Sequence, residues 1–192
     1  NYKKNQIYNL KNESLKIKKR FKKNYKNICT VWDYPVPLNW YDNGREKLSN
    51  YRRINNLFIE TLKLSQIFPD VLFLIKSKNL KWTKFSYFKE TYFKIKQTKN
   101  IIISDMSYVH AINISDLAYG NYTSTMDQMI FLNKPIVLRN YYNNFNKELY
   151  DKNILSKNFN DSCNKILYIL NNRSKALKKQ VKIKKAIFDI KI

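Results

Sequence analysis

The chain has 192 residues, of which 37 are Lys or Arg and 14 are Asp or Glu, so its formal net charge is +23. This length suits one domain, and a hydrophobic content of 44% excludes the composition of a disordered protein. Two cysteines cannot form a disulfide framework or a zinc cluster, and no apolar run reaches the roughly 18 residues that cross a bilayer. We therefore expect a folded, cytoplasmic protein without a metal.

The positive charge is concentrated at the two ends of the chain. Residues 1–27 carry ten Lys or Arg and one Glu, and residues 173–192 carry eight and one Asp. This pattern divides the sequence into a basic N-terminal arm (1–27), a central domain (28–172) and a basic C-terminal helix (173–192). Basic ends attract the phosphates of nucleic acid or of an anionic membrane surface. Alternatively, the excess of Lys reflects an A/T-rich genome. Because the chain begins with Asn1 rather than Met, we expect it to be part of a longer protein.

Short apolar runs alternate with stretches of helical spacing along the chain. Strands are predicted at 28–32, 71–75, 101–103, 117–119 and 136–138. Helices are predicted at 45–68, from 85 to 95, at 105–115 and 124–132, and from a cap at Asp161 or Ser162 to 170. The region 140–159 has no clear period and is predicted to be a loop. The alternation favours an α/β fold: a Rossmann-like parallel sheet flanked by helices, with basic helical arms at both ends.

The most informative segment is the turn between the strand at 117–119 and the helix at 124–132. It uses Gly120, one of only two glycines, and Asn121, and three hydroxyl residues then stand at the helix start: Thr123, Ser124 and Thr125. Helix N-termini present unpaired N–H groups and a positive dipole end, so they bind phosphate. In a doubly wound sheet such a turn lies where ligands bind. The alternative is that Thr123 or Ser124 only caps the helix, with Asp127 as the acidic partner of Ser124.

Residues 115–137, which read SDLAYGNYTSTMDQMIFLNKPIV, resemble the C-terminal half of GT-B glycosyltransferases. They are closest to the enzymes that build bacterial surface polysaccharide and to the related CDP-glycerol glycerophosphotransferases. The resemblance implies a donor-binding domain of a transferase that moves a glycosyl or polyol-phosphate group from a nucleotide-activated donor to a surface polysaccharide or lipid-linked acceptor. It implies no cofactor besides this donor. Asn133 stands where the family often has Gly, and Asn tolerates the left-handed conformation of a residue that follows a helix.

The resemblance also implies roles for individual residues. Thr123, Ser124 and Thr125, with the turn at Gly120 and Asn121, would contact the donor's diphosphate, and Asp127 would contact its ribose. A basic residue after the strand at 71–75, Lys76 or Lys78, would offset the charge of the departing nucleotide, although a solvated basic loop is an equal alternative. The catalytic base of the family usually comes from an N-terminal domain that this chain does not contain, so the catalytic residues stay unassigned.

Two further side chains are candidates from the residues alone. His110 is the single histidine of the chain, and its apolar surroundings favour a structural role over a catalytic or metal-binding one. Asp33 follows the first strand, where it either reaches a ligand or caps a turn. Alternative functions are a nucleic-acid-binding module that uses the basic arms, a nucleotide-sugar epimerase-like domain, and a non-catalytic Rossmann-like domain. If the transferase interpretation holds, the basic ends would keep the enzyme at the anionic inner face of the membrane.

Overall fold

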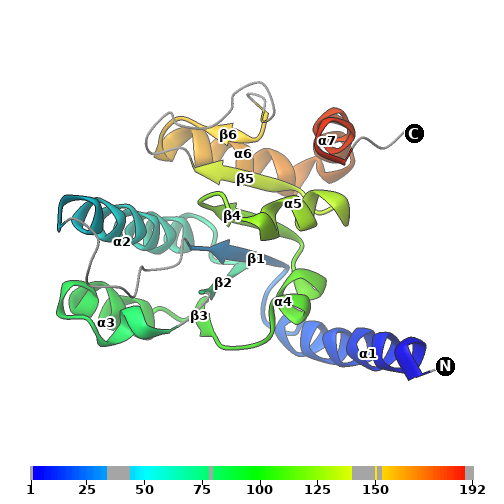
Figure 1. Ribbon diagram of the computed structural model, residues 1–192, viewed down its shortest axis with the longest axis horizontal. Coiled ribbons are helices and arrows are strands. Elements are labelled where there is room, and N and C mark those ends of the chain that lie inside the picture. Colours follow the sequence, from blue (N-terminus) through cyan, green and yellow to red (C-terminus); the bar gives the residue numbers. More distant parts are fainter. Residues whose placement is uncertain (1, 34–43, 78–79, 140–149, 151–152, 189–192) are drawn as a thin grey trace.

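The computed structural model describes residues 2–33, 44–77, 80–139, 150 and 153–188. In this part of the chain, six parallel strands form one sheet in the order β3-β2-β1-β4-β5-β6 (Figure 1). The strands are β1 (Asn27–Trp32), β2 (Val71–Lys76), β3 (Ile101–Ser104), β4 (Leu117–Gly120), β5 (Ile136–Arg139) and β6 (Leu155–Ser156). The α-helices are α1 (Tyr2–Lys22), α2 (Gly44–Ile67), α3 (Lys89–Gln97), α4 (Tyr108–Ile114), α5 (Ser124–Phe131), α6 (Phe159–Asn171) and α7 (Arg173–Phe188). The predicted fold class is confirmed.

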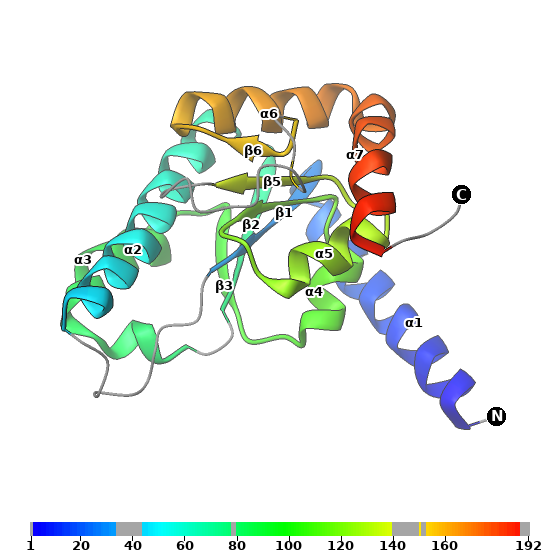
Figure 2. The same cartoon turned by 45° about the horizontal axis from the view of Figure 1, so that its top comes forward.

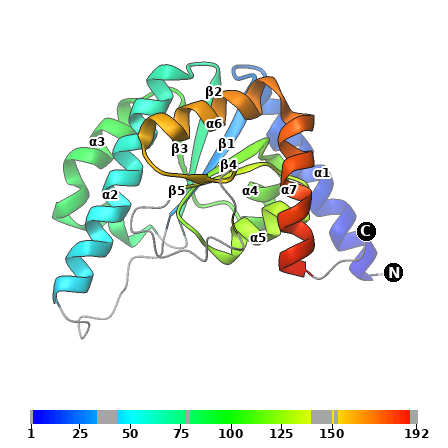
Figure 3. The ribbon, with the colours of Figure 1, turned by 90° about the horizontal axis from the view of Figure 1, so that it is seen from above.

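Helices cover both faces of the sheet. The helices α2, α3 and α6 pack on one face, and α1, α4 and α5 pack on the other (Figure 2). The helix α7 contacts the first core at Ala176 and the second at Ile183. Seen from above, the two groups lie on either side of the strands (Figure 3). Side chains of β2 alternate between the two cores: Val71, Phe73 and Ile75 join the first group, and Leu72 and Leu74 join the second. Because successive side chains of a strand point to opposite faces, this double burial explains why the strand sequence is apolar without alternation.

One carboxylate, Asp116, fastens both basic ends of the chain to the start of β4. Its side chain is 8% exposed and lies 2.7 Å from the Nζ atoms of both Lys18 and Lys22 in α1, and 3.4 Å from Nη1 of Arg173 at the start of α7. It also accepts a hydrogen bond from the N–H of Ile28 at 3.0 Å. The predicted basic N-terminal arm therefore forms a helix that is tied to the sheet at Asp116.

The surroundings of Asp116 shift the pKa values of two groups, Asp116 itself and Lys134. Burial favours the neutral form of the Asp116 carboxyl, but hydrogen bonds from Lys18 and Lys22 outweigh burial and hold its pKa below the usual value. Burial, with repulsion from Lys18 and Arg173, lowers the pKa of nearby Lys134 to about 8. Lys134 donates to the carbonyl of Ser115 at 2.8 Å. Asp116 is thus the acidic side chain that connects α1 and α7 to the amino end of β4.

The helix that was expected to begin near Phe85 begins later. Short 3-10 turns occupy Lys81–Lys84 and Ser86–Phe88, and α3 starts only at Lys89. Phe85 is extended, with φ −84° and ψ 131°, and its ring stacks on Tyr51 at a centroid distance of 5.7 Å. Packing against α2 therefore overrides the helical spacing of these aromatic residues.

Other boundaries also differ from the sequence prediction. Asn158, rather than Asp161 or Ser162, caps α6, and its side chain accepts from the N–H of Asp161 at 2.9 Å. The short edge strand β6 falls inside the region 140–159, which was predicted to be a loop, and the residues 140–149 and 151–152 of that region lie outside the described chain. Asn133 has φ 53°, as expected for a residue that follows a helix. Among the described helices, none has both the length and the apolar character to cross a membrane.

We expect Asp116→Asn to lower the free energy of unfolding by about 3 kcal/mol at pH 7, because it leaves partly buried cations without their counter-charge. Urea denaturation measures this loss. Asp70→Asn is the matched control, because Asp70 pairs with Lys26 at the surface with 61% of its side chain exposed, and it should change stability little. Equal losses in the two variants would contradict the assignment.

The wild-type protein should also lose this contribution in acid. The folded-state pKa of Asp116 is depressed, whereas an unfolded Asp titrates near about 3.9. The stabilisation is therefore complete above about pH 4 and disappears as the pH falls through the lower folded-state pKa. Urea denaturation of the wild type and of Asp116→Asn should differ at pH 7 and converge at the acid end.

Candidate functional site

A cavity of about 780 Å³ opens at the carboxyl ends of four neighbouring strands, β3, β2, β1 and β4. Its lining residues end these strands, follow them or belong to the next helices: Trp32, Asp33, Lys76, Ser77, Asp105, Met106, Ser107, Tyr108, Tyr122, Thr123, Ser124, Thr125 and Gln128. The chain runs outward from β1 to β2 and β3, and then returns to place β4 on the other side of β1. The cavity therefore lies at the switch point where doubly wound folds bind their ligands.

The turn from β4 into α5 forms one wall of this cavity. Gly120 pairs with Trp32 of β1 and has φ +144°; a Cβ atom here would lie 2.2 Å from the carbonyl oxygen of Trp32. Only glycine permits this approach. Thr123 occupies the N-cap position of α5, but its side chain makes no capping hydrogen bond. The capping alternative therefore holds for Thr123 in position only: Thr123 is the N-cap and Ser124 is the first residue of α5, but the Thr123 hydroxyl makes no hydrogen bond to the helix.

Two polar atoms in the wall of the cavity are unsatisfied. Thr123 Oγ1 and Trp32 Nε1 are buried, and neither has a hydrogen-bond partner within the described part of the chain. Buried polar atoms are normally paired, so such an atom calls for an explanation. At the start of α5 the N–H of Met126 donates to the Thr123 carbonyl at 2.8 Å, whereas the N–H groups before it have no intrahelical partner. This corner thus offers hydrogen-bonding capacity that the described fold leaves unused.

Asp127 lies beside the corner but is not one of the residues that line the cavity. Its two carboxylate oxygens accept hydrogen bonds from the hydroxyl of Tyr122 at 2.8 Å and from that of Tyr150 at 2.6 Å. Burial and the hydrogen bond to Asp127 raise the pKa of both tyrosines. This carboxylate therefore holds Tyr122, which follows the turn, and Tyr150, which lies 23 residues after Asp127 in the sequence. The side chain of Gln128, one position on, is exposed and lines the cavity.

The opposite wall carries charged side chains after β1, β2 and β3. Ser77 Oγ accepts from Trp82 Nε1 at 2.9 Å and donates to Asp33 Oδ2 at 2.5 Å, so Asp33 is held in place. Lys76 Nζ donates to the carbonyl of Ser77 at 2.7 Å. Burial lowers the pKa of Lys76, while Asp33 and Asp105 oppose this effect. The wall therefore combines one cation with two carboxylates.

The structure brings four of the predicted donor-site residues to the lining of one cavity. Thr123, Ser124, Thr125 and Lys76 line it, whereas Gly120 and Asn121 lie behind the wall and shape the turn. Lys78 is outside the described residues. His110 is not among the lining residues: its Nδ1 contacts Ser107 Oγ at 2.8 Å and its Nε2 lies 3.3 Å from Glu13 of α1. A structural role for His110 agrees with these contacts.

Sequence reasoning missed the contributions of Asp105, Met106, Ser107 and Tyr108, which follow β3, and of Gln128. The sequence did contain a signal that could have pointed to the residues after β3. The run 101–103 was predicted as a strand of a parallel sheet, and the carboxyl ends of parallel strands share one edge. The order of strands in the sheet was needed to place that end beside β4, and the sequence did not specify this order.

No protein-family model and no curated protein matches the chain. Two solved structures are similar over most of it. One is a co-structure of S. aureus MnaA with UDP: the TM-score is 0.54 at 15% identity, covering 84% of this chain and 40% of that one. The other is UDP-GlcNAc 2-epimerase from Neisseria meningitidis bound to UDP-GlcNAc, with a TM-score of 0.57 at 11% identity, covering 93% and 45%.

The likeness establishes the fold. The chain has a Rossmann-like fold of the GT-B type, and it spans less than half the length of either similar structure. At these identities the similarity assigns no role to any residue. The specific transferase family that the segment 115–137 resembles is not established by it.

Gly120→Ala should lower the free energy of unfolding by about 2 kcal/mol or more, because the added methyl group meets the Trp32 backbone and alanine is strained at this φ. Urea denaturation measures the change. Asn133→Gly is the control at the other described position with a positive φ, where glycine is compatible, and we expect little effect. An unchanged stability of Gly120→Ala would contradict the close approach of β4 to β1.

Proposed function

We propose that this chain is the donor-binding half of a GT-B-like enzyme and that a nucleotide-activated sugar or polyol binds in the cavity. The observation that carries the proposal is the corner between β4 and α5. It faces a cavity at the switch point of the sheet, and the buried Thr123 Oγ1 has no partner among the described residues. A helix N-terminus in such a place suits an anion, because its N–H groups and dipole favour negative charge.

In this proposal the diphosphate lies against the start of α5. The N–H groups of the first turn and the hydroxyls of Thr123, Ser124 and Thr125 donate hydrogen bonds to its oxygens. Lys76 adds a positive charge from the opposite wall, and the neighbouring Asp33 and Asp105 favour its protonated form. Such donors stabilise the charge that develops on a departing nucleoside diphosphate.

The remaining walls suit the other parts of a nucleotide sugar. Trp32, Met106 and Tyr108 provide apolar and aromatic surface of the kind on which a base packs. Asp33 and Asp105 are acceptors for the hydroxyl groups of a sugar or polyol. For the ribose, both Asp127 and Gln128 lie on the first turns of α5, but only Gln128 lines the cavity. We therefore assign the ribose hydroxyls to Gln128 and the support of the corner to Asp127.

The reaction that follows binding has two candidates. The resemblance of residues 115–137 favours transfer of a glycosyl or polyol-phosphate group to a surface polysaccharide or lipid-linked acceptor, with a second domain supplying acceptor and base. The second candidate is an epimerase-like reaction, which is favoured by the fold shared with a UDP-GlcNAc 2-epimerase. Incubating the full-length protein with nucleotide sugar separates them, since transfer requires an added acceptor and epimerisation does not.

We expect UDP, CDP or GDP to raise the melting temperature of the wild-type protein. At about 100 times Kd the stabilisation is about 2.7 kcal/mol, or roughly 5 to 10 °C for a chain of this size. Thr123→Val and Ser124→Ala should lose most of this shift. Ser174→Ala, an exposed position on α7, is the control and should keep it. The proposal fails if no nucleotide shifts melting, or if Ser124→Ala and Ser174→Ala respond alike to the nucleotide.

The ribose assignment has its own test with UDP and 2′-deoxy-UDP. If Gln128 hydrogen-bonds the ribose, the wild type should bind UDP about 2- to 10-fold more tightly than the deoxy compound, and Gln128→Ala should abolish this preference. Asp127→Asn should weaken both nucleotides together and lower the melting temperature, because it disturbs Tyr122 and Tyr150. If the preference survives in Gln128→Ala and vanishes in Asp127→Asn, the ribose contact belongs to Asp127. Isothermal titration calorimetry supplies the affinities.

A further inference from the structure

The positive charge of the described fold is gathered on one face of the sheet. The helix α1 packs on the face that also carries α4 and α5, and α7 packs on this face at Ile183 after starting at the other core with Ala176. Together they contain fifteen Lys or Arg and a single acidic residue, Glu13. The helices of the opposite face, α2, α3 and α6, contain nine Lys or Arg and four Asp or Glu. The cationic residues are thus sorted by the fold as well as by their position at the chain ends.

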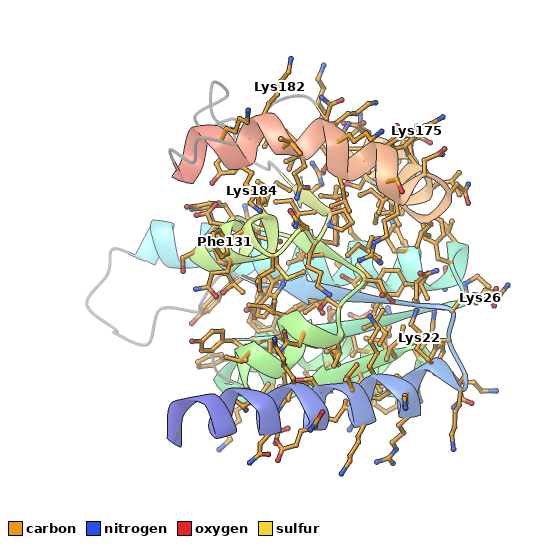
Figure 4. The ribbon with its side chains drawn as sticks, turned by 90° about the vertical axis from the view of Figure 1, so that its right-hand side faces the viewer. Lys22, Lys26, Phe131, Lys175, Lys182 and Lys184 are labelled. Carbon is orange, nitrogen blue, oxygen red and sulfur yellow. The ribbon has the colours of Figure 1, made fainter. Side chains whose placement is uncertain are left out.

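Figure 4 shows this basic face, which we define by α1, α5 and α7. Lys175 and Lys182 lie along α7, and Lys22 is the last residue of α1. Lys26 directly precedes β1, and α4 and α5 fill the space between α1 and α7. In α7, Lys175, Lys178, Lys182 and Lys185 are all exposed. The face is broad and has basic helices along two of its sides, rather than a single basic groove.

Large apolar side chains are exposed among these lysines. Phe131 and Leu132, at the end of α5, are each 48% exposed. The Nζ atom of Lys184 lies 5.2 Å from the centroid of the Phe131 ring and donates to Asn133 at 3.1 Å (Figure 4). Leu15 of α1 and Val181 of α7 are also exposed. Apolar side chains flanked by lysines are typical of surfaces that enter the headgroup region of a membrane.

The basic face is preformed. Asp116 binds Lys18 and Lys22 of α1 and Arg173 at the start of α7, so both helices are fixed to the same edge of the sheet. Ile17 and Phe21 of α1 pack against the core of this face. A partner would therefore meet an ordered surface, and binding would not require the helices to fold first.

We propose that the basic face docks on an anionic lipid bilayer, with the lysines of α7 at the headgroups and Phe131 and Leu132 inserted between them. Charge complementarity selects the anionic surface, and the exposed apolar side chains favour a bilayer over nucleic acid. The cavity lies at the carboxyl ends of the strands and has none of the lysines of α1 or α7 in its lining, so this inference does not depend on the proposed function.

The test is co-sedimentation of the whole chain with vesicles of phosphatidylcholine, alone or with 30 mol% phosphatidylglycerol. We expect binding only to the anionic vesicles, weakened by 0.5 M NaCl. Lys182→Glu with Lys185→Glu should weaken binding at least tenfold. Lys89→Glu with Lys96→Glu, two exposed positions on α3, makes the same change of net charge on the opposite face and should weaken binding less than threefold.

A second variant tests the insertion of apolar side chains. Phe131→Ser with Leu132→Ser should reduce binding to anionic vesicles although no charge changes, and melting curves verify that it folds. The proposal is overturned if the charge changes on α7 and on α3 weaken vesicle binding equally, or if the wild-type protein binds neither kind of vesicle. It is also overturned if a single-stranded oligonucleotide binds and depends on Lys182 and Lys185 while vesicle binding does not. The α7 charge variant should still be stabilised by nucleotide, so a failure of the membrane proposal can be told apart from a failure of the nucleotide site.

Discussion

The contact between Gly120 and the Trp32 backbone is the constraint on which the candidate site depends. These residues are paired at the ends of β4 and β1, and no side chain larger than hydrogen fits between them. Beyond this pair the two strands separate, β1 toward Asp33 and β4 toward Thr123. The next strands lie on opposite sides of this pair, β2 beside β1 and β5 beside β4, and among the described residues the cavity opens at this switch point.

The two ends of β4 handle polar groups in opposite ways. At its amino end, Asp116 is enclosed by Lys18, Lys22 and Arg173, and its oxygens are fully used within the protein. At its carboxyl end, the hydroxyl of Thr123 is left without a partner in the described fold. Polar groups that are satisfied internally stabilise a fold, whereas unsatisfied ones are available to a ligand. The same short segment therefore contains both a structural carboxylate and the candidate binding corner.

Asp127 is hydrogen-bonded within the fold at the position where the resemblance implies a ribose contact. Its carboxylate is shared between the hydroxyls of Tyr122 and Tyr150, so it steadies the turn and connects it to a distant part of the chain. The neighbouring Gln128 reaches the cavity instead. On a helix, adjacent residues point in directions that differ by about 100°, so a shift of one position decides which side chain faces a ligand.

The sequence by itself determined the α/β class, because apolar strands and amphipathic helices are local patterns that burial imposes on neighbouring residues. It also identified the corner at Thr123, Ser124 and Thr125, since a glycine turn followed by hydroxyl residues is read within a few positions. Only the tertiary structure decided which distant residues meet there: Asp33, Ser77 and Trp82 in one hydrogen-bonded chain, and Tyr150 on Asp127. The tertiary structure likewise decided the conformation at Phe85, where a helix was predicted but the ring stacks on Tyr51. These outcomes depend on strand order and on contacts across tens of residues, which no local period encodes.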